Sequence, residues 1–159
     1  MNWTLHAARL AADITHPVSR WRTPVAATPR HLFVPRWWQP DSGDGWTLRD
    51  GPADPKTWAA AAYSDGPSLV TQVGLLHADH AHPGDRPTGL PTSSSTHPSL
   101  VLRMLRHGMI ADTTDLLIVG AGTGYSTALA CARLGPDRVH SVDVDGYLVH
   151  AARDRLADA

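Results

Sequence analysis

The sequence is poor in cysteine and lysine, and it contains no long apolar run. Cys131 is the only cysteine among the 159 residues, which excludes an intramolecular disulfide and a zinc site built from cysteines. Lys56 is the only lysine, a bias toward arginine that we attribute to a GC-rich genome. No apolar stretch approaches the ~20 residues that a transmembrane helix needs. The first residues do not resemble a signal peptide, so we expect a soluble, cytoplasmic protein.

Neither sign of charge is in large excess. The formal net charge is −1, so neither nucleic acid nor a membrane surface is an expected partner. Hydrophobic residues make up 42% of the chain and charged residues 18%, a balance that allows the chain to bury a core. The length alone suits one ordinary domain.

Tryptophan and proline are concentrated in the first part of the chain. All six tryptophans precede residue 60, and twelve of the thirteen prolines precede residue 99. In this part the residue patterns predict a helix over residues 5–14, a helical turn over 29–34, an irregular excursion over 37–55, a strand over 68–73 and a loop over 74–91. We therefore expect it to be mostly helical and irregular.

The last part of the chain has a regular succession of apolar segments. A helix is expected to begin at residues 96–98, where Thr-His-Pro combines a capping residue with a proline. Strands are predicted over residues 116–119 and 139–142, with helices over 125–134 and 147–156. The first strand reads LLIV, a continuous apolar run typical of burial on both faces. This order predicts an α/β fold with a parallel βαβ unit.

Three alternating glycines connect the first of these strands to its helix. Gly120, Gly122 and Gly124 can adopt positive φ and allow a ligand to approach the main chain. The helix that starts at Tyr125 directs unpaired N–H groups toward such a ligand. Asp143 follows at the carboxyl end of the second strand, where its carboxylate can accept both hydroxyls of a ribose. The pattern predicts a nucleoside-binding site, with a tight turn that binds no ligand as the alternative.

The spacing of the glycines distinguishes among nucleoside cofactors. The loop reads G-x-G-x-G, whereas the dinucleotide fingerprint reads G-x-G-x-x-G, and Tyr125 takes its third glycine position. A nicotinamide-dependent oxidoreductase is therefore only a second alternative. The loop resembles the S-adenosylmethionine loop of Rossmann-like methyltransferases. The expected cofactor-binding residues are Gly120, Ala121, Gly122, Thr123, Gly124, Tyr125 and Asp143.

Four motifs in order resemble those of the protein L-isoaspartate (D-aspartate) O-methyltransferase family. Residues 28–35 (TPRHLFVP) resemble its V-P-R-x-x-F-V segment, and residues 62–67 (AYSDGP) resemble its A-Y-x-D-x-x-L stretch. Residues 92–101 (TSSSTHPSLV) resemble its Q-T-I-S-x-P-x-x-V motif, and residues 119–125 (VGAGTGY) match its I-G-x-G-S/T-G-Y loop. The resemblance covers residues 23–159 and is nearest to an actinobacterial branch associated with lanthipeptide and ATP-grasp peptide maturation.

The resemblance implies an S-adenosylmethionine-dependent carboxyl O-methyltransferase. Its substrate would be a protein or ribosomally made peptide that carries an isoaspartyl or aspartyl side chain. In the family, a hydroxyl holds the acceptor carboxylate. That catalytic role falls on Thr96 if Pro98 anchors the alignment, and on Ser95 in an alternative alignment. No metal is implied, and Tyr63 and Asp65 would lie on the substrate side.

The resemblance also suggests a division of the chain. Residues 1–112 would form an N-terminal substrate-side lobe, and residues 113–159 would form the first part of a Rossmann-like methyltransferase core. Such a sheet has about seven strands in the family, so the fold is expected to be truncated after the second core strand and its helix. An inactive or donor-binding fragment of such an enzyme is accordingly an alternative function.

Two further groups of residues have plainer interpretations. Cys131 is expected on the core face of its helix, as a small buried apolar residue. The loop over residues 74–91 contains residue types that bind metals, but a solvated loop is the favoured interpretation. These residues are His77, Asp79, His80 and His82.

Overall fold

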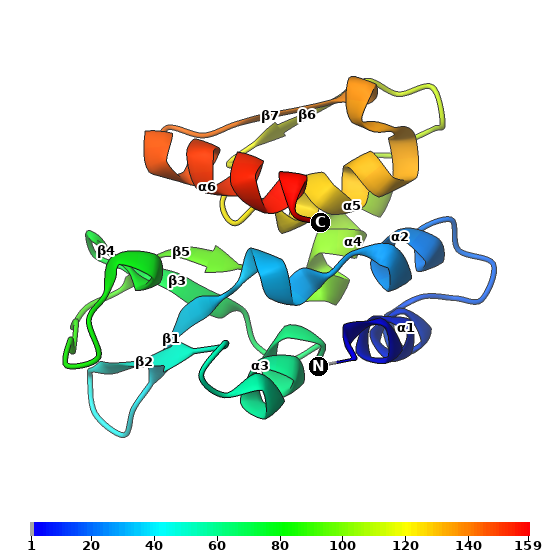
Figure 1. Cartoon of the computed structure of the whole chain (residues 1–159). Coiled ribbons are helices and arrows are strands. Elements are labelled where there is room, and N and C mark those ends of the chain that lie inside the picture. Colours follow the sequence, from blue (N-terminus) through cyan, green and yellow to red (C-terminus); the bar gives the residue numbers. More distant parts are fainter. Residues whose placement is uncertain (1) are drawn as a thin grey trace.

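The computed structural model describes residues 2–159, which form a mixed α/β fold with two separate sheets (Figure 1). In chain order the elements are α1 (Trp3–Ile14), α2 (Arg22–Ala27), the 3-10 helix η1 (Arg30–Phe33), β1 (Arg36–Pro40), β2 (Trp46–Asp50), α3 (Pro55–Ala62), β3 (Leu69–Val73), β4 (Leu76–His77), η2 (Ala78–His80), β5 (Pro91–Ser95), α4 (Pro98–His107), β6 (Leu116–Val119), α5 (Tyr125–Leu134), η3 (Pro136–Arg138), β7 (Val139–Val142) and α6 (Gly146–Ala157).

The first sheet is antiparallel, with strand order β2-β1-β3-β4 and with β5 also paired to β3. The strand predicted over residues 68–73 is β3 of this sheet, and the expectation of a mostly helical and irregular first part missed the other four strands. Residues 37–55, expected to be irregular, include the β1–β2 hairpin, in which Trp38 pairs with Leu48. Trp37 and Trp38 are both buried because they point to opposite, covered faces of the sheet. Two adjacent buried residues conceal the alternation that marks a strand with one exposed face.

Two other boundaries differ from the sequence-based expectation. The predicted loop over residues 74–91 contains the short strand β4 and the helical turn η2. The helix expected to begin at residues 96–98 begins at Pro98, but its N-cap is His97 and not Thr96. The serines before it belong to β5, where Ser94 pairs with Val70 of the neighbouring strand. Serine is common at helix starts, and here strand pairing outweighs that local preference.

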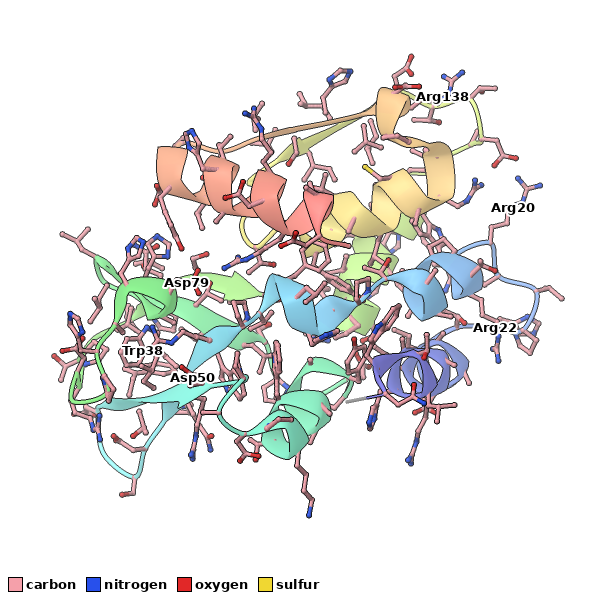
Figure 2. All side chains as sticks on the ribbon, in the orientation of Figure 1. Arg20, Arg22, Trp38, Asp50, Asp79 and Arg138 are labelled. Carbon is pink, nitrogen blue, oxygen red and sulfur yellow. The ribbon has the colours of Figure 1, made fainter. Side chains whose placement is uncertain are left out.

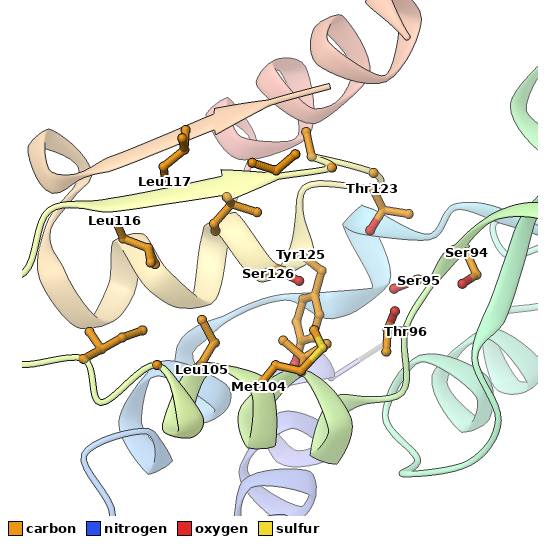
Figure 3. A pocket seen from close by; sticks show the side chains of 18 residues that line it. Ser94, Ser95, Thr96, Met104, Leu105, Leu116, Leu117, Thr123, Tyr125 and Ser126 are labelled. Carbon is orange, nitrogen blue, oxygen red and sulfur yellow. The ribbon is translucent and has the colours of Figure 1, made fainter. Parts of the chain in front are cut away.

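The second sheet consists of the parallel strands β6 and β7, paired from Leu116 with Val139 to Val119 with Val142. Both strands and helix α5 have the predicted bounds. Burial on both faces is wrong, because helices cover only one face of this pair. Leu116 and Leu117 point to opposite sides of β6 (Figure 3), and Leu117 and Val119 are 59% and 80% exposed.

One apolar core connects the helices from both parts of the chain. Leu10 of α1, Val25 of α2, Phe33 of η1 and Val101 of α4 pack in one cluster with Leu129 of α5. Helix α5 thus lies between the parallel strands and the N-terminal helices, as Figure 1 shows. Cys131 lies on the side of this helix that faces β7 and α6, but it is half-buried and not fully buried as expected. The shared core sets the glycine loop against η1.

No helix within residues 2–159 is long and apolar enough to cross a membrane.

Candidate functional site

The glycine loop curls over the carboxyl end of the parallel strands. Gly120, Gly122 and Gly124 have φ angles of 89°, 52° and 92°, which side chains with a Cβ rarely adopt. The N–H groups of Gly120 and Ala121 both donate to the carbonyl of Val142, at 2.8 and 3.0 Å. This shared acceptor holds the loop on β7.

Gly124 has a second requirement besides its φ. A Cβ at this position would lie 3.2 Å from the Cβ of Ala152 in α6 and 3.3 Å from Cδ1 of Phe33 in η1. By contrast, a Cβ added to Gly120 or Gly122 would meet no atom within 4 Å. Packing therefore restricts Gly124, whereas the space beside Gly120 and Gly122 is open to a ligand.

Asp143 lies at the carboxyl end of β7, as predicted, and its carboxylate faces the glycine loop. Its Oδ2 accepts from the N–H of Gly122 at 3.0 Å, and its Oδ1 accepts from the N–H of Asp145 at 3.0 Å. These bonds fix the carboxylate beside the loop. Each oxygen keeps a further lone pair with which it can accept another hydrogen bond.

A polar network from the antiparallel sheet supports this strand end. Nε2 of His77, in β4, donates to Oδ2 of Asp145 at 3.1 Å and holds the pKa of that carboxyl below its usual range. Asp79 accepts from the hydroxyl of Tyr147 at 2.7 Å and from Arg155 at 2.5 Å, both on α6. Figure 2 shows Asp79 on the side of the antiparallel sheet that faces α6.

This network corrects the interpretation of His77 and Asp79 as part of a solvated loop. His77 is 7% exposed, and its ring lies 4.8 Å from that of Tyr147. Because Tyr147 and Arg155 lie about 70 residues further along the chain, no local motif indicates the contact. Within residues 2–159, no group of three or more His, Cys, Asp or Glu side chains is arranged to hold a metal ion.

A pocket of about 320 Å³ lies between β6, the glycine loop, α4 and the end of β5 (Figure 3). It brings Ser95 and Thr96, the two candidates for the catalytic hydroxyl, into one cavity with most of the predicted cofactor-binding residues. These are Gly120, Ala121, Gly122, Thr123 and Tyr125. Gly124 and Asp143 do not line the pocket. Gly124 instead packs beneath the loop, and Asp143 lies at its β7 side.

The two candidate hydroxyls have different surroundings. Ser95 is 3% exposed, and its Oγ accepts a hydrogen bond from Nη2 of Arg30 at 3.3 Å. Thr96 is half-buried, and its hydroxyl forms no hydrogen bond within residues 2–159. Its side chain faces the pocket (Figure 3). Thr96 is therefore the hydroxyl that is better placed to bind a ligand.

Arg30 is a further residue at this site, and the sequence interpretation gave it no role. Its guanidinium donates to the carbonyls of Ala62 at 2.7 Å, Ser95 at 3.4 Å and Thr96 at 3.1 Å. Burial lowers the pKa of the guanidinium, and the nearby Asp65 raises it in part. Arginine nonetheless stays charged in proteins. The only signal was its place in the 28–35 motif, because arginine in a sequence is usually a surface residue.

Tyr125, the first residue of α5, also lies against this guanidinium. The Cζ of Arg30 lies 5.1 Å from the centre of the Tyr125 ring. The ring is 2% exposed, burial raises the pKa of its hydroxyl to about 12, and that hydroxyl has no hydrogen-bond partner. Tyr125 thus lines the pocket, whereas its unpaired hydroxyl and the neighbouring Arg30 cation are both buried.

Tyr63 and Asp65, expected on the substrate side, line a different, open groove between α1 and α3. The hydroxyl of Tyr63 lies 2.6 Å from Nδ1 of His31. Asp65 accepts from the N–H of Ser99 at 2.8 Å and so caps α4. The structure therefore gives both residues packing and capping roles near the site.

One comparison with known proteins finds a methyltransferase, the class of enzyme that the glycine loop resembles. A ribosomal protein L11 methyltransferase from Thiobacillus denitrificans is 35% identical over 101 residues, which cover 64% of this chain and 29% of that protein. The chain thus spans less than a third of this relative. No protein-family model matches the chain, and no solved structure matches it significantly. The chain is therefore similar to part of a methyltransferase, which is consistent with a Rossmann-like fold, and the similarity does not extend to the isoaspartate branch.

Proposed function

We propose that this chain carries the donor loop and acceptor hydroxyl of an S-adenosylmethionine-dependent carboxyl O-methyltransferase. The observation that carries the proposal is the 320 Å³ pocket, in which the glycine loop and the Thr96 hydroxyl face one cavity. The acceptor would be an isoaspartyl or aspartyl side chain of a protein or peptide. The four motifs support this acceptor, and the relative supports only the methyltransferase class.

The residues present fit the donor. Open space beside Gly120 and Gly122 lets a ligand contact the loop backbone, and the start of α5 favours binding there. Asp143 keeps acceptor capacity for ribose hydroxyls at the edge where α/β sheets bind nucleosides. When bound, S-adenosylmethionine would supply a methyl group that forms a bond to the carboxylate oxygen, while its positively charged sulfur would leave as a neutral thioether.

The acceptor needs positioning rather than deprotonation. A carboxylate is ionised at pH 7, so the pocket needs no general base. The Thr96 hydroxyl can donate one hydrogen bond to the carboxylate, and its neutral character avoids repulsion. Alignment of two reactants can lower a barrier by ~7–11 kcal/mol. The apolar side chains of α4 and β6 would exclude water from the pocket. A carboxylate that has lost its shell of water is a better nucleophile.

Two other functions have some support. The relative's name favours a ribosomal protein as a second candidate acceptor. Donor binding without turnover stays an alternative for this chain. A nicotinamide cofactor is disfavoured, since Tyr125 occupies the third glycine position of the dinucleotide fingerprint with a ring that is 2% exposed.

The test is to incubate the protein with methyl-labelled S-adenosylmethionine and matched isoaspartyl, aspartyl and asparaginyl peptides. We expect label only with the carboxylate peptides, released by mild base as an ester. Calorimetry with S-adenosylmethionine and with NAD separates donor binding from turnover. Donor binding without labelled product would leave only the donor-binding alternative, and binding of NAD alone would refute the methyltransferase proposal.

A further inference from the structure

Behind the acceptor hydroxyls lies a buried cation with no anionic partner. Arg30 is 1% exposed, and all its hydrogen bonds go to neutral acceptors, namely three carbonyls and the Oγ of Ser95. Within residues 2–159 the guanidinium forms no ion pair, and its Nε has no hydrogen-bond partner. A buried charge is costly unless it is paired, so this arrangement favours an anion nearby.

The neighbouring carboxylate of Asp65 only partly offsets this charge. Asp65 raises the pKa of Arg30 through space but is bonded elsewhere, to the N–H of Ser99 at 2.8 Å. Its other neighbour is Nδ1 of His97 at 3.6 Å. Asp65 lines the groove between α1 and α3 and not the pocket. The positive potential of Arg30 is therefore left to act on the pocket.

The pocket lies directly against the residues that Arg30 holds. Nη2 of Arg30 binds the backbone of Ser95 and Thr96, and the Thr96 hydroxyl lines the cavity. Tyr125 also lines the cavity and lies with its ring against the guanidinium, and its buried hydroxyl has no partner. Figure 3 shows Ser95, Thr96 and Tyr125 gathered at one end of the pocket.

We propose that Arg30 makes this end of the pocket selective for a carboxylate and excludes an ammonium group. The carboxylate would contact the hydroxyl of Thr96, and Arg30 would act through the Ser95–Thr96 segment as a specificity-determining residue. This inference deepens the proposed function, since it determines the chemical class of the acceptor. It needs only that the pocket binds the acceptor, and methyl transfer is not required for its test.

The first test uses the unaltered protein and peptides of one sequence. At one position the peptides carry aspartate, asparagine or 2,4-diaminobutyrate, and a fourth carries isoaspartate. Calorimetry should show the carboxylate peptides binding at least about tenfold tighter than the amide, in line with a hydrogen bond to a charged group. The ammonium peptide should bind weakest. Equal affinity of carboxylate and amide, or no binding of either carboxylate, overturns the proposal.

Three variants separate charge from packing. Arg30→Met removes the charge and keeps a long side chain, so the aspartate and asparagine peptides should bind this variant with about equal affinity. Arg30→Lys keeps the charge and should keep the preference, even if three carbonyls lose part of their bonding. Arg133→Met is the control, because Arg133 is also largely buried but pairs with Asp112 away from the pocket.

The measurement in these variants is the ratio of affinities, which a purely structural role would not change. If Arg30→Met does not fold, Arg30→Gln decides the question, because it removes the charge but keeps N–H donors for the carbonyls of Ala62 and Thr96. A folded Arg30→Met protein that keeps the preference refutes it. Binding of S-adenosylmethionine is measured in parallel, so a failed donor site is distinguished from a failed acceptor site.

Discussion

The two sheets of the molecule differ in how their faces are covered. In the antiparallel sheet, Trp37 and Trp38 are adjacent in β1 and are 4% and 1% exposed on opposite faces. In the parallel pair, Leu117 and Val119 leave one face of β6 exposed to solvent at 59% and 80%. Burial of apolar area is the main stabilising contribution to folding, so the antiparallel sheet should hold its shape more firmly.

The site combines the two regions. The parallel pair supplies the glycine loop and Asp143, and the antiparallel sheet supplies Ser95 and, through β4, His77. A residue of the antiparallel sheet, His77, thus positions Asp145 at the end of the parallel pair. Substitutions in the antiparallel sheet should mainly change the free energy of unfolding, whereas those at the glycine loop should mainly change ligand binding.

The largest effect is expected from Trp38→Ala in the covered sheet. The indole packs against Val73, Ala78 and Ala81 and donates to the carbonyl of Leu76 at 3.3 Å. Removal of a buried aromatic ring typically costs ~3–5 kcal/mol of the free energy of unfolding. Urea unfolding followed by circular dichroism measures it. A cost below about 1 kcal/mol would contradict a closely packed antiparallel sheet.

Loss of donor binding is expected from Gly122→Val at the loop. A branched side chain would occupy the open space beside the loop and would strain a φ of 52°. Gly74→Val is a matched control, because Gly74 has a φ of 56°, also faces open space, and lies in the β3–β4 turn. Calorimetry with S-adenosylmethionine should lose its signal only for Gly122→Val. Equal affinities in both variants would mean that the loop is only a turn.

A smaller loss is expected from Asp143→Ala. The carboxylate orders the loop through the N–H of Gly122 and is the expected acceptor for ribose hydroxyls. Removal of a charged hydrogen-bond partner should weaken donor binding by ~1–3 kcal/mol. Asp143→Asn keeps one acceptor oxygen and should bind with intermediate affinity. Unchanged affinity in both would remove Asp143 from the binding site.

The contact between the two regions predicts a dependence of stability on pH. The hydrogen bond from His77 holds the pKa of Asp145 below its usual range, so the ionised form of this carboxylate stabilises the folded state. This stabilisation is present above the unfolded pKa, near 4, and is lost as pH falls through the lowered folded pKa.

The variant His77→Ala should therefore lose less stability than the unaltered protein between pH 5 and pH 3, because the pKa of its Asp145 lies closer to the unfolded value. His77→Gln keeps an N–H donor and should retain more of the pH response. Urea midpoints across this range provide the measurement. Parallel pH curves for the unaltered protein and His77→Ala would show that the contact does not couple the sheets.

The smallest effect is expected from Val119→Thr on the exposed face of β6. The side chain is 80% exposed, and threonine keeps the branched shape that suits a strand. The free energy of unfolding should change by less than about 0.5 kcal/mol. A loss of several times that size, seen in the same urea experiment, would mean that this face is covered in solution.

The parallel pair and its loop were accessible from the sequence because their signals are local. A short apolar run, alternating glycines and a helical period lie within 30 residues, and the bounds of β6, α5 and β7 agree with the prediction. The β1–β2 hairpin was missed because both faces of β1 are buried. Burial on both faces of β6 was wrongly predicted, since an apolar run does not reveal how many layers cover it.

The site was predictable to the same extent. The hydroxyls of Ser95 and Thr96 and the loop residues were found from motifs, and the structure places them around one pocket, except for Gly124, which packs beneath the loop. Arg30 was not assigned a role because its acceptors, such as the carbonyls of Ala62 and Thr96, lie 32 and 66 residues away. Main-chain acceptors leave no pattern of residue types along the chain.

The sequence by itself determined the elements whose causes are short-range, namely the glycine loop, the strands that flank it and the acid at the end of β7. Backbone conformation and apolar period decide these, and both are properties of neighbouring residues. Only the tertiary structure decided that Thr96 has the free hydroxyl, that Arg30 is an unpaired buried cation behind it, and that His77 supports the loop from another sheet. Burial and hydrogen bonding between distant segments decide these properties, and both arise only when the chain packs.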